Sequence, residues 1–103
     1  MGAVQVRVLP VTDRHAAAAE GLVEELRAGG IRAESSDTTE TLPKRVRLAE
    51  MERVPYIAVL GDREAESGGV SLRTRGAKQA VPMGRAELVA HVAERIRARA
   101  HDA

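Results

Sequence analysis

Hydrophobic residues recur along the chain with two spacings: every second residue in some segments, which is typical of strands, and every three to four residues in others, which is typical of helices. Residues 4–10 alternate valine with other side chains and end at a proline, which predicts a strand. Residues 14–28 carry apolar side chains at helical spacing, and a glycine pair follows that ends the helix. Residues 31–35 predict a second, short strand. The first third of the chain therefore predicts the order strand, helix, strand.

The middle of the chain contains its most continuously apolar segment. A polar turn at residues 36–40 precedes a helix predicted over residues 42–53, with a proline in the first turn, where a missing N–H does little harm. Residues 56–60 are all apolar or aromatic, as expected of a central strand that is covered on both faces. Residues 70–75 predict the return strand of a hairpin whose tip lies at residues 67–69.

The last third of the chain completes an α/β fold. We expect a very short strand around Glu64, a loop over residues 76–84 and an amphipathic helix over residues 85–99. The first strands should be parallel because helices connect them. The prediction is one domain, residues 1–103, with a five-stranded mixed sheet flanked by three helices. The predicted core consists of Val8, Leu26, Val46, Ile57, Val59, Leu72, Leu88 and Val92.

Composition narrows the classes of function. The chain has no cysteine, which excludes a disulfide scaffold and a thiolate metal site. Tyr56 is its one aromatic residue, so RNA bases could not stack on an aromatic platform. The net charge of +1 is too small to indicate nucleic-acid binding by itself. The sequence shows neither a membrane-spanning run nor a signal-peptide pattern, so we expect a cytoplasmic protein without a membrane partner.

Few residues are arranged for catalysis or metal binding. The histidines His15, His91 and His101 lack the spacing of metal ligands. Asp13 and His15 lie two residues apart at a helix start, where a general base is conceivable. The more ordinary interpretation is a helix cap from Thr12 or Asp13 and a solvated loop residue at His15. The sequence therefore predicts a non-catalytic protein that needs no metal and no small-molecule cofactor.

The return strand of the predicted hairpin carries the clearest signal for binding. Alternation sends Val70 and Leu72 to one face of the sheet. The other face receives Ser71, Arg73 and Arg75. Guanidinium groups in such a row can donate paired hydrogen bonds to nucleobase edges and phosphates. From the pattern alone, a merely solvated sheet face is the alternative.

Several segments occur together in an order and spacing that resemble one known family. They are residues 4–13, residues 25–32, Lys44-Arg45-Val46-Arg47, Val54-Pro55-Tyr56, Gly61-Asp62-Arg63-Glu64 and Val70-Ser71-Leu72-Arg73. From Val4 to Arg99 the chain resembles the C-terminal anticodon-binding domain of class II aminoacyl-tRNA synthetases, most closely that of the threonyl enzymes. The resemblance implies a five-stranded mixed sheet with three helices and a surface that binds tRNA during translation.

The resemblance also implies which residues contact RNA. Arg73 occupies the place of an arginine that reads an anticodon base. Glu64 and Arg47 match residues that face the same bases, and Arg75 follows Arg73 on the same strand face. Guanidinium donors suit base acceptors, and a carboxylate accepts from amino or imino groups. The RNA-binding residues predicted in this way are Arg47, Glu64, Arg73, Arg75 and Thr39.

The turn before the second helix departs from the family pattern. The family usually has Arg-Asn-Glu-Lys there, whereas this chain has Thr38-Thr39-Glu40-Thr41. Thr39 replaces an asparagine that contributes to base recognition, and two basic positions are lost. Two functions stay open: a non-catalytic tRNA-binding module, or a protein-interaction or regulatory module that keeps the fold without specific RNA recognition. Whether the chain is free-standing or excised from a synthetase also stays open.

Overall fold

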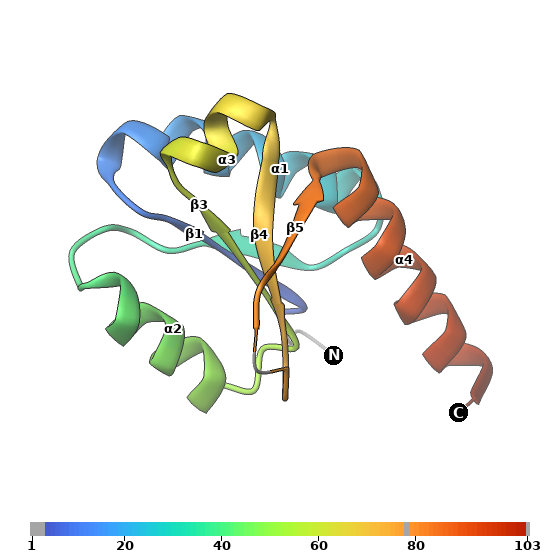
Figure 1. Ribbon diagram of the computed structural model, residues 1–103. Helices are drawn as coiled ribbons and strands as arrows, with labels where there is room; N and C mark the ends of the chain where they lie inside the picture. Colours follow the sequence, from blue (N-terminus) through green and yellow to red (C-terminus); the bar gives the residue numbers. More distant parts are fainter. Residues whose placement is uncertain (1–3, 78, 103) are drawn as a thin grey trace.

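The computed structural model describes residues 4–77 and 79–102, which form a five-stranded sheet with helices on both faces (Figure 1). The elements in chain order are β1 (Val6–Pro10), the 3₁₀ turn η1 (Asp13–His15), α1 (Ala16–Ala28), β2 (Ala33–Ser35), α2 (Leu42–Met51), β3 (Tyr56–Leu60), α3 (Asp62–Ser67), β4 (Gly69–Thr74), β5 (Val81–Gly84) and α4 (Arg85–Asp102). The predicted α/β class is confirmed. Within the described residues, no helix has the length and hydrophobicity needed to cross a membrane.

The sheet has the strand order β2-β1-β3-β4-β5, which places β3 at the centre as predicted. β1 pairs in parallel with both β2 and β3, whereas β4 and β5 are antiparallel to their neighbours. The first connection leads outward from β1 to β2, and the second leads back across β1 to β3. Because both crossovers have the same hand, their helices lie on opposite faces of the sheet.

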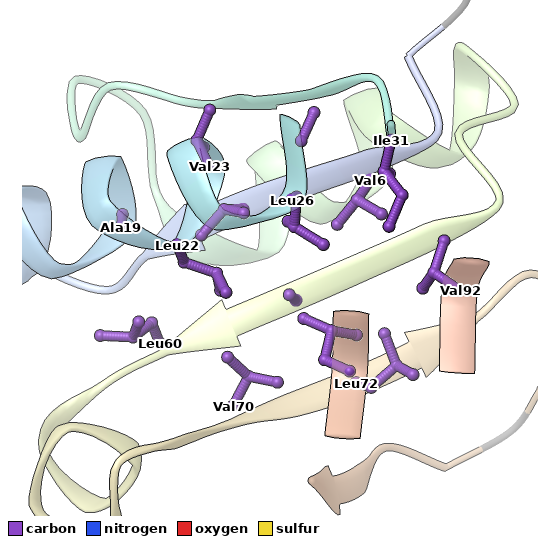
Figure 2. Packing of buried hydrophobic residues seen from close by; sticks show 14 residues of the cluster. Val6, Ala19, Leu22, Val23, Leu26, Ile31, Leu60, Val70, Leu72 and Val92 are labelled. Carbon is purple, nitrogen blue, oxygen red and sulfur yellow. The ribbon is translucent and has the colours of Figure 1, made fainter. Parts of the chain in front are cut away.

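The larger core lies between the sheet and the helices α1 and α4. Figure 2 shows how Leu22 and Leu26 of α1 lie over the same sheet face as Leu60 and Leu72. These side chains are at most 2% exposed. Burial of this size is the main favourable contribution to folding, at roughly 25 cal/mol for each Å² of apolar surface removed from water. The larger core therefore fixes α1 and α4 against one face.

A smaller core lies on the opposite face, where α2 packs alone. Its fully buried members are Leu9, Ala49, Val54 and Ile57. The predicted core residues Val46 and Val59 also pack against this cluster, but they are only partly buried and lie at its margin. A single helix cannot cover the whole face, and residues at the margin of its footprint keep part of their surface in water. The other six predicted core residues are buried.

One charged side chain is buried beneath α2. Arg45 is 5% exposed. Its Nη1 donates to the carbonyl of Pro10 at 2.6 Å and to Ser36 Oγ at 3.1 Å. Its Nε donates to the carbonyl of Glu40 at 3.1 Å, and its Nη2 to that of Val11 at 3.3 Å. This guanidinium therefore links the end of β1 to both ends of the β2–α2 turn.

Two connections differ from the sequence prediction. The residues around Glu64 form the helix α3 and not a short strand, so β3 and β4 are joined by a helix and not by a simple hairpin. The Glu64 carboxylate accepts the Gly61 N–H at 2.8 Å and stabilises this helix start, which a strand could not use. α3 ends at Gly68, whose φ of 75° favours glycine.

The fifth strand lies in the segment that was predicted to be a loop. Residues 81–84 form β5, which pairs with β4 along the edge of the sheet. Pro82 weakens the strand signal in the sequence, but an edge strand tolerates a proline. The prediction of five strands is thus correct, with the fifth at β5 and not around Glu64.

The smaller core gives a test of the fold. Ile57 is 3% exposed and Val59 is only partly buried. We expect Ile57→Ala to lower the free energy of unfolding by about 2–4 kcal/mol and Val59→Ala by about 1 kcal/mol, because the second change leaves a smaller cavity. Urea unfolding followed by circular dichroism measures both. Equal losses for the two variants would contradict the placement of α2.

The buried guanidinium gives a second test. Arg45→Met keeps an unbranched side chain of similar length but leaves three carbonyls without their donor. We expect it to lower the free energy of unfolding by about 2–4 kcal/mol, and Arg45→Lys to lower it less, because an ammonium group keeps some of the bonds. The same urea titration applies. A methionine variant as stable as the native chain would show that these bonds contribute nothing net.

Candidate nucleic-acid interface

Half of one sheet face is open. The smaller core contains residues of β1, β3, α2 and the segments just before β1 and β3, and none of β4 or β5 among the described residues. Figure 1 shows α2 on the side of β1, away from β5. Pro82 of β5 is exposed on this face, and Ser71 of β4 is half-buried. The part of the face formed by β4 and β5 is named here the open half-sheet.

The strand register places Arg73 on the open half-sheet. Val70 and Leu72 are at most 2% exposed and face the larger core, so the intervening residues point the other way, as predicted. Arg73 lies opposite Ile57 of β3, and its side chain is half-buried. In the described part of the chain, no carboxylate forms an ion pair with it. The Arg73 guanidinium therefore lies on the open half-sheet and forms no ion pair with a carboxylate of the described residues.

Arg75 and Arg47 lie on either side of this position. Arg75 follows the end of β4, is exposed, and donates its backbone N–H to the carbonyl of Pro55 at 2.8 Å. Arg47 is exposed on α2, the helix that covers the same sheet face. Neither side chain has an ion-pair partner among residues 4–77 and 79–98. Of the five predicted RNA-binding residues, the strand register therefore places Arg73 on the open half-sheet, while Arg75 lies in the turn after β4 and Arg47 is exposed on α2.

Glu64 and Thr39 lie at the other end of the sheet. Glu64 is half-buried in α3, which follows the carboxyl end of β3, whereas Arg73 is paired near the start of β3. From Ile57 to Leu60 alone the strand rises by about 10 Å. The structure therefore does not bring Glu64 and Arg73 into contact. Thr39 is exposed in the β2–α2 turn, where its N–H donates to Asp37 Oδ1 at 3.1 Å.

The surroundings of Thr39 are acidic. The β2–α2 turn borders an open groove of about 730 Å³ that is lined by Pro10, Asp13, Ala16, Glu20, Ser35, Ser36, Asp37, Thr38 and Thr39. Two hydroxyls of the lining donate to carboxylates, Ser35 to Glu20 at 2.8 Å and Thr38 to Asp13. No basic residue lines the groove among the described residues. The potential at this end of the sheet opposes the approach of a phosphate.

The sequence interpretation of Asp13 and His15 is wrong. Neither Thr12 nor the start of α1 shows a side-chain cap, and the Asp13 carboxylate instead accepts the Thr38 hydroxyl. His15 is 5% exposed, and its Nε2 lies 2.9 Å from Asp62 Oδ1. η1 turns this ring inward beneath the start of α3. No group of three His, Asp or Glu side chains in the described chain could hold a metal ion.

Sequence reasoning missed three residues whose environment is unusual. His15 lies four residues before Ala19, on the helical stripe that α1 buries, and this spacing could have indicated its burial. Arg45 falls between Leu42 and Ala49 on the buried stripe of α2, which could have indicated a buried charge. Arg53 is exposed just after α2, and its only sequence signal is its place shortly before Val54-Pro55-Tyr56.

Two ligases resemble the chain in sequence. The threonine–tRNA ligase of Symbiobacterium thermophilum is 42% identical over 102 residues, which is 99% of this chain and 16% of the ligase. The threonine–tRNA ligase of Thermotoga neapolitana is 45% identical over 76 residues, which is 74% of this chain and 12% of the ligase. The chain thus spans a small part of these relatives.

Two solved structures share the fold. The RNA binding domain of threonyl-tRNA synthetase from Cryptosporidium parvum Iowa II has a TM-score of 0.83 at 22% identity, over 88% of this chain and 23% of that chain. Histidyl-tRNA synthetase from Nostoc sp. PCC 7120 has a TM-score of 0.84 at 20% identity, over 91% of this chain and 23% of that chain.

The family model described as the anticodon binding domain matches residues 5–95. That range includes every strand of the sheet and all of the predicted RNA-binding residues. It begins one residue before β1 and ends within α4. The chain therefore belongs to the anticodon-binding domain family of class II aminoacyl-tRNA synthetases.

Proposed function

We propose that this domain binds tRNA through the open half-sheet, with Arg73 at the centre of the interface and Arg47 and Arg75 at its margins. The observation that carries the proposal is an arginine on an uncovered sheet face without a local carboxylate partner. A guanidinium in this state has all of its paired donors available for a base edge or a phosphate. The role of the domain is binding and not catalysis.

The half-buried setting of Arg73 suits a specific contact. Its backbone is paired with Ile57 of β3, and the pairing of β4 with β5 ends one residue earlier, at Leu72, so the sheet fixes its backbone from one side. A side chain that is already restricted loses little conformational entropy when it binds. Its planar fork can pair with two acceptors of a guanine edge or with two phosphate oxygens. Support for tRNA as the ligand comes from the family and from the ligases that the chain resembles.

The distribution of charge sets the direction of RNA binding in this proposal. Arg73 and Arg75 lie at the end of the sheet where β3 begins and β4 ends, and the acidic groove lies beyond the carboxyl ends of β1 and β2. The RNA backbone should follow the arginine end. In this proposal Glu64 and Thr39 accept hydrogen bonds from base donors, because neither supplies positive charge.

A second candidate function rests on a different observation. α2 exposes Leu48 at 39% and Met51 at 71%, and two basic positions of the family turn are missing. Exposed apolar side chains on one helix are compatible with a protein partner. In this alternative the domain is a protein-interaction or regulatory module that keeps the fold. Loss of RNA binding together with an intact fold would favour it.

Arg73 provides the direct test of RNA binding. We expect Arg73→Ala to weaken the binding of total tRNA by about 1–3 kcal/mol, and Arg73→Lys to restore only part of it, because lysine cannot form the bidentate pair. Affinity should also fall with salt along a shallow slope, since few basic side chains reach phosphates. Filter binding at two salt concentrations measures both effects.

The matched control is Arg97→Ala, which removes the same charge from an exposed position of α4 on the opposite sheet face. This variant should bind tRNA as the native chain does. If both alanine variants lose equal affinity for tRNA, the net charge of the domain and not the position of the arginine determines binding. If neither variant loses affinity, the open half-sheet is not the interface.

The β2–α2 turn provides a test of specificity. We expect the native chain to discriminate a threonine anticodon from others by less than about tenfold, because one hydroxyl cannot replace the paired donor and acceptor of an amide. Thr38→Arg with Thr39→Asn should raise both affinity and discrimination. Thr41 is left unchanged because its Oγ1 accepts the Lys44 N–H at 3.3 Å and caps α2. Competition between anticodon stem-loops measures the change.

The control for this experiment is Thr38→Arg alone, which adds the positive charge without the amide. A gain in affinity but not in discrimination is expected for that variant. Strong selectivity of the native chain would show that Thr39 suffices for recognition. No gain in the double variant would mean that the turn does not face the RNA.

A further inference from the structure

The backbone at the end of α2 has an unusual residue in a common motif. Arg53 has a φ of 61° and is the one non-glycine residue with positive φ in the described chain. Its N–H donates to the carbonyl of Glu50 at 3.0 Å, and the Val54 N–H donates to that of Ala49 at 3.0 Å. These two bonds form the helix-ending motif in which the left-handed position is usually a glycine.

Glycine would suit this position better than arginine. An L side chain in the left-handed region brings its Cβ close to the following carbonyl, and glycine avoids this contact. Both hydrogen bonds of the motif come from the backbone, so they do not require the arginine side chain. The chain therefore keeps a strained arginine where the fold itself favours glycine. Non-glycine residues in this region cluster at functional sites.

The position of Arg53 associates it with the open half-sheet. Arg53 precedes Pro55 by two residues, and the Pro55 carbonyl accepts the Arg75 N–H at 2.8 Å. The segment between α2 and β3 therefore meets the end of β4 near the pair Ile57 and Arg73, while Glu52 at the end of α2 contacts Arg7 of β1. Arg53 is exposed and has no ion-pair partner in the described chain.

Other arginines of the chain contrast with this one. Arg7, Arg14 and Arg85 each contact a carboxylate within 3.1 Å, and Arg45 is bonded to carbonyls inside the fold. Arg53, Arg73 and Arg75 have no such partner among the described residues, whereas Arg7, which lies opposite Ile57 of β3, is paired with Glu34 and Glu52. The bond between Pro55 and Arg75 brings the segment that carries Arg53 to the end of β4, where Arg73 and Arg75 lie. Several guanidinium groups in one region suit a multiply charged anionic ligand.

We propose that Arg53 is a phosphate-binding residue of the RNA interface, and this inference rests on the proposed function. An exposed guanidinium on a rigid helix end can reach a phosphate beside the base that Arg73 contacts. Contacts to phosphates fix the position of the RNA and carry the salt dependence of binding, whereas base contacts carry specificity. In this proposal Arg73 contributes specificity through a base contact, and Arg53 contributes affinity that does not depend on the RNA sequence.

A structural role makes the opposite prediction. A positive charge near the end of a helix interacts favourably with the helix dipole, so Arg53 could be present for stability alone. In that case its replacement by glycine would lower stability, and RNA binding would fall only together with the stability of the fold. The two interpretations differ in whether stability and affinity change in the same direction.

The experiment measures both quantities on Arg53→Gly and Arg53→Lys. Arg53→Gly should keep or raise the urea midpoint, because the backbone strain is removed. The same variant should bind a threonine anticodon stem-loop about three- to tenfold more weakly at 0.1 M salt, and the slope of log K against log salt should fall by about 0.7–0.9. Arg53→Lys should keep the salt slope, since an ammonium group also binds phosphate.

Two variants separate the possible failures. Arg73→Ala reports on the interface itself, and Arg97→Ala controls for the loss of one charge on another face. If the native chain binds no RNA, the proposed function fails and this inference fails with it. If Arg73→Ala weakens binding while Arg53→Gly binds with the native affinity and salt slope, only the inference about Arg53 is overturned. A fall in both stability and affinity in Arg53→Gly would assign Arg53 a structural role and also overturn it.

Discussion

Both parallel connections of the sheet cross with the same hand, and this constraint governs the distribution of its surfaces. Since one connection leads outward from β1 and the other leads back across it, α1 and α2 lie on opposite faces. α4 then joins α1, so one face carries two helices and the other carries one. A single helix cannot cover five strands. The open half-sheet is thus a consequence of chain topology, and the chain needs only polar residues on β4 to turn it into a binding surface.

The same constraint explains the burial of Arg45. The core beneath α2 has four fully buried residues, so apolar packing alone holds this helix less firmly than the larger core holds α1. The guanidinium adds hydrogen bonds between α2, the end of β1 and both ends of the β2–α2 turn. A buried charge is tolerated when its donors are satisfied, as most of them are here. The hydrogen bonds of Arg45 therefore add to the small apolar core in holding α2 against the sheet, beside the candidate interface.

The sequence predicts the parts of this fold that depend on periodicity. The alternation in β1, the apolar run of β3 and the stripes of α1 and α4 were sufficient for order, class and central strand, and alternation alone placed Arg73 opposite Val70 and Leu72. α3 and β5 were misassigned because one is short and charged and the other contains Pro82. The separation of Glu64 from Arg73 could not be predicted, since nine residues of sequence do not reveal which end of a strand each occupies.

The separation of charge along the sheet connects these features. Arg53, Arg73 and Arg75 lie near the start of β3 without a carboxylate partner, while Glu34 and Glu52 are paired with Arg7 there; carboxylates and no basic residue line the groove beyond the opposite strand ends among the described residues. A polyanion approaching this face meets attraction at one end and repulsion at the other, so electrostatics can orient it before any base is read. The net charge of +1 is a sum over the whole chain and does not show where the unpaired arginines lie. Binding capacity here depends on where the fold places its arginines and not on how many the chain contains, and a strained Arg53 at the basic end is consistent with that dependence.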